Sequence, residues 1–112
     1  MYYIEASRET PLVSLNSEKG VFLIDGECVS ETPDEFFNNI TNWIEKYSKN
    51  PYKTTTLTIN LRGINISSSK FLLNIIYQLE NIYKSGFQVK IRWVYKNGED
   101  GNYELGKDYS EM

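Results

Sequence analysis

The chain has 112 residues, 40% of them hydrophobic and 14% aromatic, which is enough apolar mass for one domain with its own core. Its formal net charge of -3 provides no basic footprint for nucleic acid or for an anionic membrane surface. The chain has no histidine and a single cysteine, Cys28, so the commonest general base, a zinc site and an internal disulfide are all excluded.

Hydropathy along the chain predicts neither a membrane span nor a secretion signal. The sequence has no run of about 18 or more apolar residues, and no charged segment followed by an apolar one at its start. We therefore expect one domain over residues 1–112, in the cytoplasm and without membrane insertion. We also expect no cofactor and no enzymatic activity.

The first third of the chain predicts strands. Short apolar runs at Tyr2 to Ile4, Leu12 to Leu15 and Val21 to Asp25 have the composition of strands. The turn-forming segment Asn16 to Gly20 separates the last two runs, which predicts a β-hairpin with a five-residue loop. Asp25-Gly26 predicts a further turn.

A helix is predicted to begin at Thr32. Threonine is a good cap, Pro33 suits the first helical position, and Glu35 completes a capping box three residues after the cap. Asn50-Pro51 ends the helix, because proline cannot continue the hydrogen-bond ladder. The apolar positions fall on one helical face: Phe36, Phe37, Ile40, Trp43, Ile44 and Tyr47.

The second half of the chain predicts a strand, a helix and another strand. Residues from Thr54 to Arg62 alternate between apolar and polar, the pattern of a strand. A second helix starts within the serine run Ser67 to Ser69 and ends at Gly86. Its apolar stripe consists of Phe71, Leu72, Ile75, Ile76, Leu79, Ile82 and Tyr83.

Alternation over Phe87 to Tyr95 predicts the last long strand. The tail from Asn97 is polar, and a short helix is predicted from about Tyr103. The resulting order predicts an α/β domain of the mixed α+β kind, whose four- or five-stranded mixed sheet carries two amphipathic helices on one face.

One segment concentrates groups that recognise anions. Residues Asn65 to Lys70 lie where a strand ends and a helix begins, and such a junction collects free backbone N–H groups at the positive end of the helix dipole. A phosphate there would add charge and three strong acceptors. The alternative is that the three serines only cap the helix, and that Lys70 and Arg62 are solvated surface charges.

Four segments of the sequence together carry a family resemblance. They are Met1-Tyr2-Tyr3-Ile4-Glu5-Ala6 with Thr10-Pro11, Pro33-Asp34-Glu35-Phe36-Phe37, Asn65 with Ser67-Ser68-Ser69-Lys70-Phe71-Leu72-Leu73, and Val89-Lys90-Ile91-Arg92-Trp93-Val94-Tyr95. With these segments the chain resembles, over nearly its whole length, the SiaC-type biofilm-regulation phosphoproteins, whose fold is similar to STAS domains and bacterial anti-sigma factor antagonists.

This resemblance implies a regulator of partner switching, in which a dedicated kinase phosphorylates the start of the second helix and a phosphatase reverses the modification. The unphosphorylated form is then expected to bind and activate a diguanylate cyclase and to promote biofilm formation. In the family's pattern a threonine follows the asparagine and is the expected phosphoacceptor, but here that residue is Ile66. Either Ser67 has taken over as acceptor, with Ser68 and Ser69 as further candidates, or the protein stays in one binding state.

Two classes of function follow from these observations. In the first, the protein is an interaction module. Its partner is a cyclase, or it acts as a regulator like the anti-sigma factor antagonists. The residues expected to contact the partner are Arg62, Asn65, Lys70 and Asn74. In the second, residues 65–70 hold a small anionic ligand. Gly63 is the only glycine near this segment, which disfavours a phosphate-binding loop.

Overall fold

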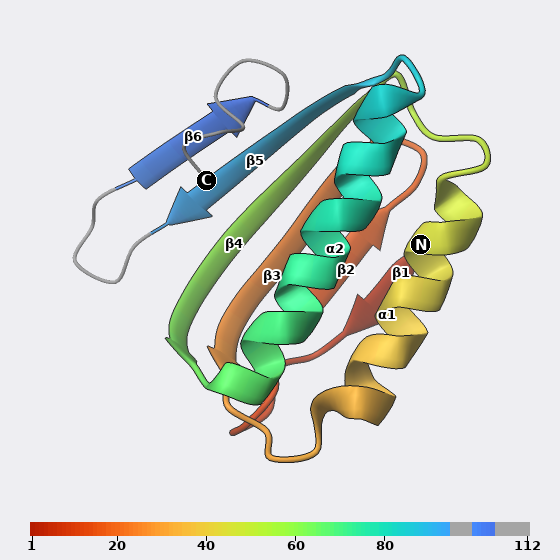
Figure 1. Ribbon diagram of the computed structural model, residues 1–112. Coiled ribbons are helices and arrows are strands. Elements are labelled where there is room, and N and C mark those ends of the chain that lie inside the picture. Colours follow the sequence, from red (N-terminus) through yellow and green to blue (C-terminus); the bar gives the residue numbers. More distant parts are fainter. Residues whose placement is uncertain (95–99, 105–112) are drawn as a thin grey trace.

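Six strands form one mixed sheet in the computed structural model, which describes residues 1–94 and the backbone of 100–104. The order of the strands across the sheet is their order along the chain (Figure 1). They are β1 (Tyr2–Ile4), β2 (Leu12–Asn16), β3 (Val21–Cys28), β4 (Thr54–Ile64), β5 (Gln88–Val94) and β6 (Asp100–Glu104). β3, β4 and β5 are mutually parallel, and β1, β2 and β6 pair antiparallel to their neighbours. The predicted mixed α/β fold is confirmed, and β6 adds a strand beyond the four or five expected.

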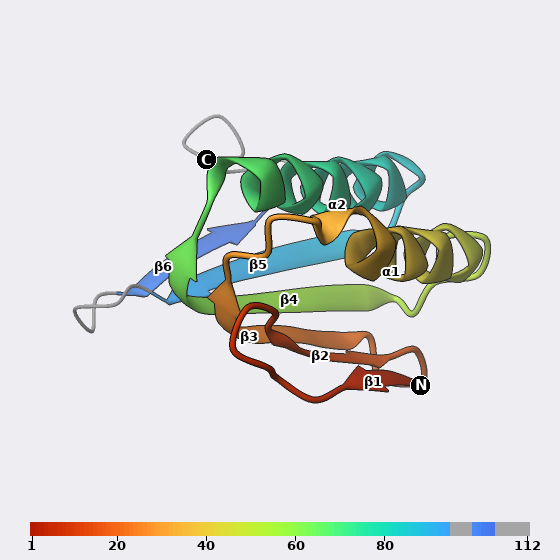
Figure 2. The same cartoon turned by 90° about the horizontal axis from the view of Figure 1, so that it is seen from below.

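Both helices cover the same face of the sheet (Figure 2), as predicted. α1 (Pro33–Tyr47) connects β3 to β4, and α2 (Ile66–Lys84) connects β4 to β5. Because each helix joins two parallel strands, it runs back across the sheet, and its amino end lies near the carboxyl end of the strand before it. α1 and α2 therefore point the same way, with their carboxyl ends side by side (Figure 1).

The core lies between the two helices and the sheet. Along β3, β4 and β5, buried apolar residues alternate with more exposed ones, which is the period-two pattern predicted from the sequence. The buried side chains on the helix-facing side of the sheet include Phe22, Ile24, Leu57, Ile59, Val89 and Ile91. On α1 the buried apolar residues are Phe37, Ile40, Ile44 and Tyr47, and the other members of the predicted stripe, Phe36 and Trp43, pack against the core.

The carboxyl end of α1 is joined to the sheet by a buried polar contact. The hydroxyl of Tyr47 lies 2.7 Å from Oγ1 of Thr55, which is fully buried in β4. The same hydroxyl accepts a hydrogen bond from the backbone N–H of Tyr52. The Tyr47 ring stacks on Trp43, with the ring centroids 5.6 Å apart. This end of the helix is therefore held by both packing and hydrogen bonds.

The predicted turn at Asp25-Gly26 is wrong, because β3 continues through it to Cys28. Gly26 has a φ of +133°, which side chains disfavour, and it is buried against Pro11. Between Gly26 and Glu27 the pairing with β4 shifts by one residue, so that Arg62 is the extra residue of a β-bulge. The glycine therefore marks a bulge within paired strands and not the end of a strand.

Thr32 is the N-cap residue of α1, as predicted, but its side chain makes no capping hydrogen bond. Its backbone N–H donates to Oγ of Ser30 at 3.1 Å. Pro33 is the first residue of the helix, as expected, and the acidic Asp34 and Glu35 lie in the first turn, where they complement the helix dipole.

Smaller differences concern the hairpin and the tail. β2 includes Asn16, which pairs with Val21, so the hairpin loop is one residue shorter than predicted. Tyr103 lies in β6 and does not begin a helix. The rest of the tail, and the predicted strand end at Tyr95, lie outside the described residues. Tyr83, assigned to the core from the sequence, is 38% exposed.

Candidate functional site

Asn65 fixes the geometry of the junction between β4 and α2. It is the N-cap of α2, and its Oδ1 accepts the backbone N–H of Ser68 at 2.9 Å. Its Nδ2 donates to the Ser30 carbonyl at 2.9 Å, and its backbone N–H donates to the Cys28 carbonyl at 3.1 Å. The cap, predicted for the serine run, therefore belongs to Asn65. Its bonds join the start of α2 to the end of β3 and to the loop before α1.

The three serines that follow have three different environments. Ser67 is exposed at the second position of the helix. Ser68 is 1% exposed, and its buried side chain neighbours the Cys28 thiol. The hydroxyl of Ser69 donates to the Ile66 carbonyl at 2.7 Å within the first turn. Of the three predicted phosphoacceptors, Ser67 is therefore the most exposed residue.

The first turn of α2 contains only neutral and positive side chains. The first turn contains no acidic residue, so no side chain of the turn neutralises the positive end of the helix dipole. Lys70 is exposed and follows Ser67 by three positions, a spacing that places the two side chains on neighbouring parts of the helix surface. An anionic group on Ser67 would thus meet the helix dipole and one ammonium group.

An exposed apolar stripe runs along α2 from the same end. Ile66, Leu73 and Tyr77 are 79%, 47% and 49% exposed, and with Lys70 they follow one another in steps of four, three and four residues. Such steps place side chains on one face of a helix. Asn74, predicted to contact a partner, is exposed next to Leu73. We call Ile66, Lys70, Leu73 and Tyr77 the α2 stripe.

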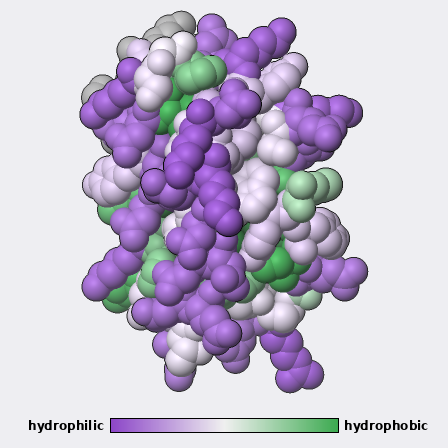
Figure 3. All heavy atoms as spheres, turned by 90° about the vertical axis from the view of Figure 1, so that its right-hand side faces the viewer, coloured by the Kyte–Doolittle hydropathy of each residue, from purple (hydrophilic) through white to green (hydrophobic). Residues whose placement is uncertain are grey.

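Sequence reasoning missed the apolar part of this stripe. Leu73 and Tyr77 fall outside the apolar stripe assigned to the core, on the opposite side of the helix. Two large apolar residues on the polar face of an amphipathic helix indicate a contact surface, and this signal could have been found in the sequence alone. α1 differs, because the side of the molecule formed by α1 is mainly hydrophilic (Figure 3).

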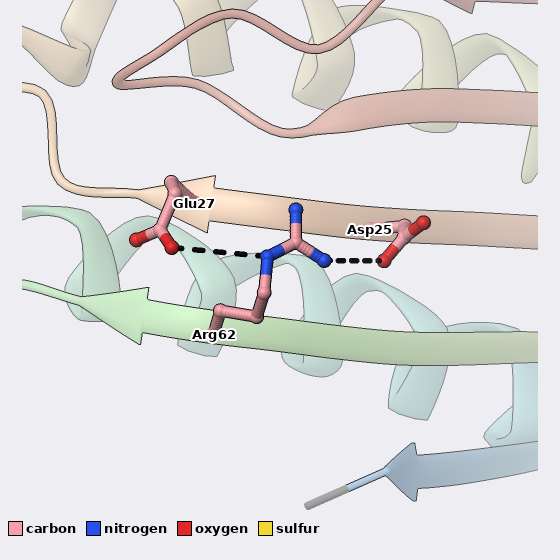
Figure 4. A network of polar contacts seen from close by, with 3 residues as sticks. All are labelled: Asp25, Glu27 and Arg62. Carbon is pink, nitrogen blue, oxygen red and sulfur yellow. Dashed lines mark ion pairs between the residues drawn. The ribbon is translucent and has the colours of Figure 1, made fainter. Parts of the chain in front are cut away.

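Arg62 does not join the site, although it precedes Ser67 by only five residues. It lies on the face of the sheet opposite the helices, between two carboxylates of β3 (Figure 4). Its guanidinium is 3.7 Å from Asp25 Oδ1 and 3.8 Å from Glu27 Oε1. The bulge in β4 and the alternation of the strand direct Arg62 away from α2. Arg62 and Lys70, which were predicted to form one contact surface, therefore lie apart in the structure.

Behind the junction, Cys28 is buried beneath the first turn of α2. Burial raises the pKa of its thiol above the usual value, and the neighbouring Ser68 side chain offsets part of that rise. A buried, protonated thiol is a poor nucleophile. Among the side chains of residues 1–94, no three His, Cys, Asp or Glu are close enough to hold a metal ion. No helix in this part of the chain is long and apolar enough to cross a membrane.

Comparison with known protein families places this geometry in context. The family model described as SiaC family regulatory phosphoprotein matches residues 4–112. The chain belongs to the SiaC family.

Known SiaC structures share the fold. The crystal structure of apo-SiaC from Pseudomonas aeruginosa is 25% identical, with a TM-score of 0.80 over 86% of this chain and 79% of that one. A second structure contains the P. aeruginosa diguanylate cyclase SiaD in complex with its activator SiaC. It is 22% identical, with a TM-score of 0.80 over 99% of this chain and 85% of that one. An uncharacterised protein of P. aeruginosa strain UCBPP-PA14 is 25% identical over 109 residues, which cover 97% of this chain and 86% of the relative.

Proposed function

We propose that this SiaC-family protein binds a diguanylate cyclase and activates it, and that phosphorylation at the start of α2 prevents the binding. Its family consists of regulatory phosphoproteins, and a SiaC of the same fold is known as the activator of a diguanylate cyclase. In this role the protein is a regulator without catalysis of its own. It acts in the bacterial cytoplasm, and the cyclase it activates promotes biofilm formation.

The observation that carries the proposal is the α2 stripe. The three apolar side chains of the stripe have between 47% and 79% of their surface exposed. Burying such surface stabilises a protein complex by about 25 cal/mol per Å² of apolar area. A stripe of this kind suits the surface of another protein better than a small anion. It therefore favours the interaction module over the alternative of an anionic-ligand-binding domain.

Control by phosphorylation follows from the position of Ser67 beside this stripe. A phosphate on Ser67 would add about 1.5 to 2 negative charges next to Ile66 and Lys70. Those charges would have to lose water when a partner covers the stripe, and Lys70 would pair with the phosphate and not with the partner. A cognate kinase would thus switch the surface off, and a phosphatase would restore it.

The proposal is tested by adding the purified, unmodified protein to a purified diguanylate cyclase from the same organism and measuring the rate of cyclic di-GMP synthesis. We expect the rate to rise and to saturate at a fixed ratio of the two proteins. The Leu73→Asp variant, which places a charge in the α2 stripe, is expected to lose the activation while remaining folded. An unchanged rate together with no binding in a titration would refute the proposal.

A further inference from the structure

A polar groove lies between the carboxyl-terminal turns of α1 and α2, at the end of the helices away from Ser67. Its volume is about 250 Å³, below the roughly 300–1,000 Å³ of clefts that hold drug-sized ligands. Ser67 and Ser85 are separated by roughly 27 Å along the axis of α2, at 1.5 Å per residue. The groove is therefore separate from the junction. It is lined by Glu45, Ser48, Gln78, Asn81, Ile82 and Ser85.

The two serine hydroxyls of the groove have no proton left to donate to a ligand. Oγ of Ser48 donates to the Glu45 carbonyl at 2.6 Å, and Oγ of Ser85 donates to the Asn81 carbonyl at 3.0 Å. A hydroxyl has one proton and two lone pairs, so each oxygen retains only accepting capacity. Toward a ligand in the groove, both serines act as acceptors.

Gln78 and Glu45 add further accepting oxygens. Nε2 of Gln78 donates to the Thr41 carbonyl at 2.9 Å, which joins α2 to α1 and fixes the orientation of the amide. Its Oε1 is buried and accepts no hydrogen bond from the described residues. The Glu45 carboxylate is exposed in the last turn of α1. The lining thus offers a carboxylate and several acceptors against the single amide donor group of Asn81 and the second N–H of Gln78.

The helix dipoles act in the same direction. Both helices end beside the groove, so the negative ends of two roughly parallel dipoles meet there. The lysines of these last turns, Lys46 and Lys84, do not line the groove, and Lys84 is paired with Glu80 at 2.8 Å. Charge and hydrogen-bonding capacity therefore both select a ligand that is positive and rich in donors.

We infer that this groove is a second binding site, which takes an alkyl ammonium or guanidinium group. The group enters between Glu45 and Asn81, where its N–H donors meet the carboxylate and the serine oxygens. Two sources carry this chemistry: a lysine or arginine side chain of a docked protein, or a free polyamine. A site of this kind would give the protein a contact that modification at Ser67 does not reach.

The test uses nuclear magnetic resonance titrations of the full-length, ¹⁵N-labelled protein with butylguanidinium. Butylurea, which has nearly the same shape and no charge, is the control ligand. We expect saturable shifts of the backbone amides of Glu45, Ser48, Asn81 and Ser85 with butylguanidinium, and no shifts with butylurea. Spermidine and the peptide acetyl-Gly-Arg-Gly-amide then distinguish the two sources, since the tighter binder identifies the class of natural ligand.

Variants separate a site from general attraction to an acidic protein. Glu45→Gln removes the carboxylate from the groove, and we expect about fivefold weaker butylguanidinium binding. Glu35→Gln removes an exposed carboxylate at the other end of α1 and should leave the affinity unchanged. Equal shifts with butylurea, unsaturable shifts spread over the surface, or equal losses in both variants would each overturn the inference.

Discussion

The side-chain amide of Asn65 donates to the backbone carbonyl of Ser30, and this bond joins the start of α2 to the loop that enters α1. The same side chain caps α2 through Ser68. One residue thus sets the positions of both helix amino ends at the carboxyl edge of the parallel strands, where the proposed control point lies.

Replacing Asn65 with alanine removes both side-chain bonds and is expected to lower the free energy of unfolding by about 2 kcal/mol. Urea denaturation followed by circular dichroism measures this change. Asn65→Asp retains an acceptor for the cap but loses the donor to Ser30, so we expect it to lose about half as much. Asn74→Ala, at an exposed position of α2, should not destabilise the protein. Equal stability of Asn65→Ala and the wild type would contradict the cap geometry.

Ser67 is the expected phosphoacceptor. Incubation with the cognate kinase should add one phosphate, which intact-mass measurement and peptide mapping locate at Ser67, because this residue is exposed while Ser68 is buried. Ser67→Ala should abolish the mass increase, whereas Ser69→Ala should retain it. If no kinase or cell extract modifies the protein, Ile66 in place of the family's threonine has abolished phosphorylation, and the protein stays in its binding state.

Tyr77 is expected to contribute to partner binding without contributing much to stability. It is 49% exposed, so Tyr77→Ala should change the free energy of unfolding by less than about 0.5 kcal/mol. Calorimetric titration with the cyclase should show a loss of about 1–2 kcal/mol in binding, as for an aromatic interface residue. Tyr83→Ala, on another side of the same helix, is the matched control. Equal effects of the two variants would place the interface away from the α2 stripe.

Burial of Cys28 predicts a pH dependence with a definite sign. The pKa of the folded thiol is raised, so the unfolded chain ionises first as the pH rises, and stability falls from the usual thiol pKa upward. Urea midpoints measured at pH 7 and pH 9.5 should therefore decrease more for the wild type than for Cys28→Ala. The native thiol should also resist alkylation at pH 8 and react only after unfolding. Rapid alkylation of the folded protein would show that Cys28 is accessible.

Much of the fold follows from local patterns. The apolar residues of α1 recur at helical spacing, and those of β4 and β5 alternate with polar residues as in strands. The residues at these apolar positions are the ones that the structure buries or packs against the core. β6 was not predicted, because it begins at Asp100 in a polar segment with little apolar alternation, and an edge strand needs only one pairing partner.

Other features depend on contacts that local sequence does not contain. Asp25-Gly26 has the composition of a turn, but pairing with β2 and β4 holds it within a strand. Thr32 is the N-cap residue of α1, as its residue type predicts, but its side chain makes no capping hydrogen bond, and its backbone N–H donates to the hydroxyl of Ser30. The role of the junction as a control point stays a prediction. The direction of Arg62 depends on a bulge that only the pairing of β3 with β4 reveals.

Every strand of the sheet pairs with the strand that precedes it in the chain, β1 excepted. Each pairing in the sheet therefore closes only one hairpin or one helical connection, and the short length of these connections limits the loss of chain entropy. During synthesis, each new strand emerges when its partner has already been made. The strand order thus keeps each pairing between strands that are neighbours in the sequence, and the domain, whose single core includes residues of α2, is expected to fold as one unit.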